Sequence, residues 1–133
     1  MATKIVNGGL VMPSTALSAW ASIPKYIGWG SGTGTTAVGD TTLFTEKDVD
    51  ISSGTGTRTT GTAATATTTQ TGDTFQITGT RTATGAGTVT NAGLWDNATI
   101  GSGTLFLKGD FTGIGLASGD AIAFTIKAAF SSA

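Results

Sequence analysis

The stretch AIAFTIKA at residues 121–128 alternates larger apolar side chains with small or polar ones. Successive side chains of a β-strand point to opposite faces, so this spacing predicts a strand with Ile122, Phe124 and Ile126 on its buried face. The turn-forming sequence Ser-Gly-Asp at 118–120 stands directly before it. We therefore expect the chain to close with a half-buried strand.

The same kind of pattern recurs upstream of this strand. Short apolar or alternating runs predict strands at residues 24–30, 41–47, 74–80, 91–96 and 105–111. The Thr/Ala/Gly tract at 54–70 is compatible with disorder or with a Thr-rich strand, and the alternating threonines favour the strand. Turn signals come every 8 to 12 residues, without a long helical period. This organisation predicts an all-β fold, a single β-sandwich or jelly-roll-like domain.

The first 23 residues follow a different pattern, with neither clean alternation nor sustained helical spacing. They are too apolar for a solvated tail. We expect residues 1–23 to form an extended N-terminal arm along a neighbouring subunit, or else an edge strand folded back on the domain at 24–133. A secretory signal is disfavoured because Asn7, Gly8, Gly9 and Pro13 interrupt its apolar core. No apolar run reaches the length of a membrane helix, so no membrane partner is expected.

The composition is polar but barely ionic. Charged residues make up 11% of the 133-residue chain, the net charge is −1, and there are 29 threonines and 21 glycines. A nucleic-acid partner is not expected, because binding to the phosphate backbone needs clustered positive charge. Removing water from a surface with so few charges costs little free energy, which indicates contact with other copies or with a partner.

The residue types that usually serve in catalysis or metal binding are absent, or they stand where a structural role is expected. The chain has no His and no Cys, which removes the commonest general base, nucleophile pairs and thiolate ligands. The aspartates stand beside glycines or at strand ends, where Asp normally caps turns. Asp48-x-Asp50 lacks the Gly and Glu of an EF-hand, and the Gly-rich segment 28–34 lacks the Lys of a phosphate loop. We expect no catalytic residue, no metal site and no cofactor.

Several segments together resemble a family of small virion proteins of tailed phages, variously described as structural, fibre-like or cement proteins. The resemblance covers roughly residues 24–130 and leaves residues 1–23 outside it. It is carried by the segments PKYIGWG (24–30), LFTE (43–46), TNAGLWD (90–96), LFLKGDF (105–111) and GDAIAFTI (119–126). It implies no catalytic residues and a particle-bound role, which we expect to be that of a capsid decoration protein.

On this basis we expect a non-enzymatic protein at the capsid surface of a virion. It would bind the major capsid protein from outside as a homotrimer or dimer and stabilise the shell. The candidate interface residues are Ile5, Leu10, Val11, Leu17, Trp20, Tyr26, Trp29 and Trp95. Among Tyr26, Trp29 and Trp95, core packing is favoured for at least two. The alternatives are a tail-fibre or baseplate component and a carbohydrate-binding module that stacks sugars on tryptophan.

Overall fold

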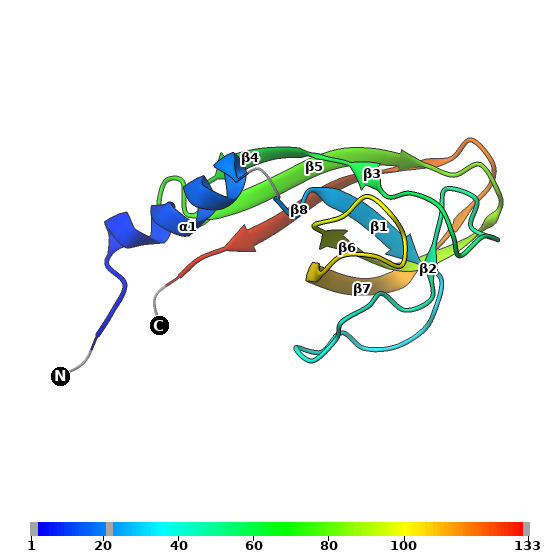
Figure 1. Ribbon diagram of the computed structural model, residues 1–133, viewed down its shortest axis with the longest axis horizontal. Helices are drawn as coiled ribbons and strands as arrows, with labels where there is room; N and C mark the ends of the chain where they lie inside the picture. The colour runs from blue at the N-terminus through cyan, green and yellow to red at the C-terminus, as the bar shows by residue number, and fades with distance from the viewer. Residues whose placement is uncertain (1–2, 21–22, 132–133) are drawn as a thin grey trace.

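The chain folds mostly into antiparallel β-sheets, as the sequence predicts at this level (Figure 1). The computed structural model describes residues 3–20 and 23–131. Their elements in chain order are α1 (Asn7–Ala19), β1 (Tyr26–Gly30), β2 (Glu46–Lys47), β3 (Thr59–Thr60), β4 (Thr62–Ala66), β5 (Thr74–Thr82), β6 (Gly87–Trp95), β7 (Leu105–Leu116) and β8 (Ala121–Ala129).

Two sheets contain all of these strands. The first has the order β2-β1-β6-β7, with β3 also paired to β1, and the second has the order β4-β5-β8. Every pairing between named strands is antiparallel. In this order β7 forms one outer edge of the first sheet, while β4 and β8 form the two edges of the second.

The four long strands form a single hairpin that is folded over on itself. Only residues 83–86 separate β5 from β6, and only residues 117–120 separate β7 from β8. Across this corner the backbone of Ala83 bonds to Gly119 and to Asp120, each at 2.7 Å. One half of the hairpin thus belongs to each sheet, and the corner lies at the end of the molecule away from α1 (Figure 1).

The apolar core joins both sheets. One cluster combines Ile27 of β1 and Leu94 of β6 with Phe75 and Ile77 of β5. A second cluster is built from Trp29, Ile51, Ala83, Val89, Ala92 and Leu116. The apolar side chains that β7 and β8 add to these clusters are mostly only partly buried. The core is therefore better covered at β1, β5 and β6 than along β7 and β8.

The extended conformation predicted for the N-terminal segment is wrong, because residues Asn7–Ala19 form the helix α1. Leu10, Ser14 and Leu17 recur at helical spacing and turn toward β4 and β5. Ser14 Oγ donates to the carbonyl oxygen of Gly72, so this polar group is satisfied although it is fully buried. The helical period is hard to recognise in the sequence, because a polar residue, Ser14, occupies the middle of the buried face and Pro13 precedes it.

The strand predicted at 41–47 is also much shorter than expected. Only Glu46–Lys47 pairs with β1, and the preceding residues 31–45 form a long loop. Thr45 has a φ of 50°, a left-handed value that ends any extended run at this point.

Candidate interaction surfaces

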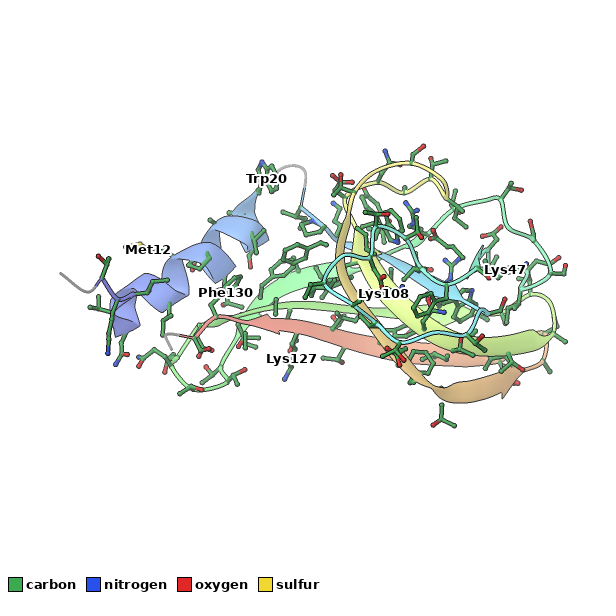
Figure 2. All side chains as sticks on the ribbon, turned by 90° about the horizontal axis from the view of Figure 1, so that it is seen from below. Met12, Trp20, Lys47, Lys108, Lys127 and Phe130 are labelled. Carbon is green, nitrogen blue, oxygen red and sulfur yellow. The ribbon has the colours of Figure 1, made fainter. Side chains whose placement is uncertain are left out.

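An apolar groove lies where α1 meets the ends of β7 and β8. We call it the helix groove, and it has a volume of about 560 Å³. Its lining residues are Pro13, Ala16, Leu17, Ala19, Trp20, Phe106 and Phe130. Trp20, the residue after the helix, borders this groove and is still 60% exposed. Met12 is 70% exposed and lies on the side of α1 away from the strands (Figure 2).

Large exposed apolar side chains gather in and beside the helix that forms this groove. No charged residue occurs between Lys4 and Lys25. Leu10 is buried, whereas Met12 on the helix and Ile5 and Trp20, which flank it, are exposed. Exposed apolar side chains that gather in one uncharged segment mark a surface for contact with a partner. The outer side of α1 is therefore a candidate interaction surface.

This helix also has little stability of its own. Gly8 and Gly9 lower its intrinsic propensity, Pro13 removes one backbone donor, and no side chain caps its N-terminus. Its attachment rests on Leu10, Leu17 and Ser14. A partner that covered the exposed side of α1 would bury more apolar surface and so stabilise the helix.

A second groove separates the edges of the two sheets on the side of β7 and β8. We call it the edge groove, and its volume is about 320 Å³. Leu107, Gly109 and Phe111 of β7 and Phe124, Ile126 and Lys127 of β8 line it. The side chains of β8 alternate between exposed and half-buried along the whole strand, which confirms the predicted alternation but leaves its inner face incompletely covered.

The loop 31–45 is fastened to β7 by charged side chains. Lys108 Nζ donates to Asp40 Oδ2 at 2.8 Å and lies 3.2 Å from the centre of the Phe44 ring. The backbone N–H of Thr36 donates to Asp110 Oδ1 at 2.8 Å. Asp40 and Asp110 both have a lowered pKa, caused chiefly by the hydrogen bonds with Lys108 and Thr36, respectively.

Two buried arginines, Arg58 and Arg81, bind carboxylates and backbone carbonyl oxygens beside the core. Arg58 donates from Nε to Glu46 Oε1 at 2.6 Å and from its terminal nitrogens to Glu46 and to the carbonyl oxygens of Asn97, Thr99 and Ser102. The dense charges of residues 46–50 suggest an exposed loop, but the side chain of Glu46 is only 11% exposed and is paired.

Arg81 plays a similar part near Trp29. It donates to the carbonyl oxygens of Thr57 and Lys47, and its terminal nitrogen lies 3.6 Å from Asp48 Oδ1. Burial lowers its pKa to about 10, and the nearby carboxylates of Asp48 and Glu46 oppose this shift. A guanidinium with that pKa is still charged at neutral pH, so this pair is a structural ion pair.

Asp40, Asp73 and Asp120 take the turn-capping role that their positions predict. Asp110 does not, because it bonds to the distant Thr36. Asp40 and Asp120 accept backbone N–H bonds from residues three positions earlier. Asp73 accepts such bonds from Gln70, Thr68 and Thr69 at 2.8–3.0 Å. These bonds, with that from Gln70 the strongest, hold the pKa of Asp73 far below its usual value although burial opposes the shift. These carboxylates are engaged with the fold.

The predicted interface residues fall into three groups. Ile5 and Trp20 are exposed, Val11, Leu17 and Tyr26 are half-buried, and Leu10, Trp29 and Trp95 are buried. Arg58 lies 3.8 Å from the ring centre of Trp95, and Arg81 lies 5.0 Å from that of Trp29. Burial and these cations leave neither ring free to stack on a sugar. The helix groove brings Leu17 and Trp20 together with Phe106 and Phe130, which the sequence reasoning did not single out.

Within residues 3–20 and 23–131, no three carboxylates come together as a metal site would require. In the same part of the chain, no helix is both long and apolar enough to cross a bilayer. Comparison with known families, with curated proteins and with solved structures finds no match to this chain.

Proposed function

We propose that this chain is a non-enzymatic structural protein of a virus particle, a capsid decoration protein that binds the outer capsid surface in many copies. The resemblance to small virion proteins suggests the particle, and the exposed helix groove supports a role in assembly. The major capsid protein is the proposed partner.

The observation that carries the proposal is the outer side of α1. It exposes Met12 and Trp20 within a segment that has no charge from Ile5 to Pro24. Burying a side chain of this kind contributes about 1.5–3 kcal/mol, so a single copy would bind weakly. Many copies on a repeating shell, or an oligomer with several such helices, would gain avidity without a tight individual contact.

The proposed architecture suits this role. We take the two sheets and their shared core to be a β-sandwich of the jelly-roll-like kind, built by folding the long hairpin over. The helix α1 lies at one end of it, opposite the hairpin corner (Figure 1). The helix groove, which Phe130 lines, is therefore at that end as well. A rigid body with an apolar patch at one end can attach through that end and leave the remaining polar, Thr-rich surface in solvent.

Co-sedimentation tests the proposal directly. Purified protein is added to shells of the encoding phage that lack it, and the pelleted amount is measured against concentration. Saturable binding at a fixed number of copies per shell is expected. Electron microscopy of virions with labelled protein provides the location: label over the shell supports the proposal. Label confined to the tail overturns it in favour of a fibre or baseplate component, and failure to bind shells removes the decoration role.

A further inference from the structure

We infer that two copies of this chain join through β8, pairing antiparallel edge to edge around Phe124 so that the two second sheets become one continuous sheet. Within the described residues, β8 bonds only to β5, and its other side has no strand partner. An unpaired edge presents a row of backbone donors and acceptors that a further strand can satisfy.

This edge lacks the devices that normally prevent such pairing. Proteins protect free edges with charges, prolines, bulges or covering elements. Residues 121–126 contain no charge and no proline, and the nine pairs of β8 with β5 run without a register shift. At the other edge of the same sheet, β4 packs against α1. The edge strand of the first sheet, β7, carries Lys108, Asp110 and a register shift against β6.

The edge groove makes covering this side favourable. Phe124 and Ile126 of β8, together with Phe111 of β7, are only partly buried, although they pack against the two core clusters. A strand added beside β8 would extend the sheet over these side chains. The gain is apolar burial as well as backbone hydrogen bonds.

The geometry of β8 selects a second copy as the occupant. In an antiparallel pair centred on Phe124, each Ile122 faces Ile126 of the second copy on the same side of the sheet, because side chains alternate with a period of two. Lys127, the one charge of β8, then faces Ala121 of the second copy, so no like charges meet. A two-fold axis through Phe124 thus matches apolar with apolar residues at positions 122, 124 and 126 of the inner face, while Ala128 lies beyond the paired residues.

The available area suits a weak, reversible dimer. With the two-fold axis at Phe124, residues 121–127 of the two copies face one another; these seven residues are about 23 Å long, and two sheets packed about 10 Å apart present an edge roughly 20 Å wide. Pairing such edges buries about 450 Å² per copy, or about 900 Å² in total, which is typical of interfaces that dissociate on dilution. This inference stands apart from the proposed function, because it is tested on the purified chain without any capsid.

Mass measurement in solution tests the inference. Light scattering after size-exclusion chromatography should give a mass twice the 13.2 kDa of one chain, falling toward the monomer on dilution. The double variant Ala123→Lys/Thr125→Lys changes two exposed side chains and places lysine opposite lysine across the proposed pair. It should weaken the dimer by about tenfold or more, while the circular dichroism spectrum stays unchanged.

Two further variants make the test specific. Ala123→Lys/Thr125→Asp places opposite charges across the same pair and should restore the dimer. Thr62→Lys/Ala64→Lys adds the same two charges to exposed positions on β4 and should leave the dimer intact. A wild-type monomer at all concentrations, a dimer indifferent to the two lysines on β8, or a Lys/Asp variant that stays monomeric overturns the inference. A dimer lost only on Trp20→Ser overturns it in favour of the helix groove.

Discussion

The guanidinium of Arg58 lies 3.8 Å from the centre of the Trp95 ring, and both side chains are buried. From this position Arg58 binds the carboxylate of Glu46 on β2 and three carbonyl oxygens of the loop that joins β6 to β7. The side chain of Arg58 therefore connects the loop between β6 and β7 to the short strand β2, which lies at the edge of the first sheet away from β7.

Arg58→Met should destabilise the protein by about 3–5 kcal/mol, because Glu46 then keeps a poorly hydrated charge without a partner. The three loop carbonyls would lose their donor as well. Urea unfolding followed by tryptophan fluorescence measures the change. Lys4→Met, at an exposed position outside the core, is the control and should change stability by less than about 0.5 kcal/mol. A similar small effect of Arg58→Met would show that the cation is dispensable.

Gly30→Ala should destabilise the first sheet, whereas Gly109→Ala should not. A Cβ at Gly30 would lie 2.3 Å from the carbonyl oxygen of Phe44, so the backbone must move. Nothing lies within 4 Å of a Cβ at Gly109, which is also in a strand. We expect a loss of about 1–3 kcal/mol for Gly30→Ala and a neutral or slightly stabilising effect for Gly109→Ala. Thermal unfolding of the two variants side by side decides between these outcomes, and equal melting temperatures contradict the close approach.

The strands with alternating residues were predictable because their pattern reflects burial directly. Phe75 and Ile77 on β5, and Ile122 and Phe124 on β8, occupy alternate positions and face the core. Arg81 shares the same alternation with Phe75 and Ile77. That spacing is the sequence signal for its burial, and it conflicts with the general exposure of charged side chains.

The helix α1 and the helix groove could not be predicted from the pattern of apolar residues. Ser14 occupies a fully buried position of α1, while Met12 and Trp20 are exposed, so polarity and burial are inverted along this segment. A helical period can be recognised only where the two agree. Phe106 and Phe130 join Trp20 through tertiary contacts that no spacing in the sequence encodes.

Stability should fall as the pH drops below about 4, and Asp73 should contribute to the fall. Its carboxylate accepts backbone N–H bonds from Gln70, Thr68 and Thr69, which keep its pKa in the folded protein well below its usual value of 3.8. A group whose pKa is depressed on folding stabilises the protein above its unfolded pKa. That stabilisation is lost as the pH falls toward the folded pKa.

The variant Asp73→Asn isolates this contribution. At pH 7 it should melt at a lower temperature than the wild type, since an amide cannot accept all of these bonds. The difference between the two proteins should shrink steadily from pH 5 to pH 2, as the wild type loses its advantage. Melting curves across this range provide the measurement. If the difference in melting temperature between the two proteins stays constant with pH, the destabilisation by Asp73→Asn comes from altered packing and not from the lost charge.

Trp20→Ser should weaken shell binding by about tenfold or more while leaving the domain folded. The indole is 60% exposed, so its removal costs little folding free energy, whereas its burial against a partner would contribute about 1.5–3 kcal/mol. Leu17→Ala is a less selective change, because Leu17 lines the same groove but also packs against the core cluster around Phe75. It should reduce both binding and stability.

Val38→Ser is the matched control for this prediction. Val38 is fully exposed in the loop 31–45, outside the helix groove, so its loss removes a comparable exposed apolar group from a different surface. Co-sedimentation with shells should be unaffected by Val38→Ser and strongly reduced by Trp20→Ser. If both variants bind like the wild type, the helix groove is not the contact surface. If Val38→Ser alone loses binding, the contact runs through the loop 31–45.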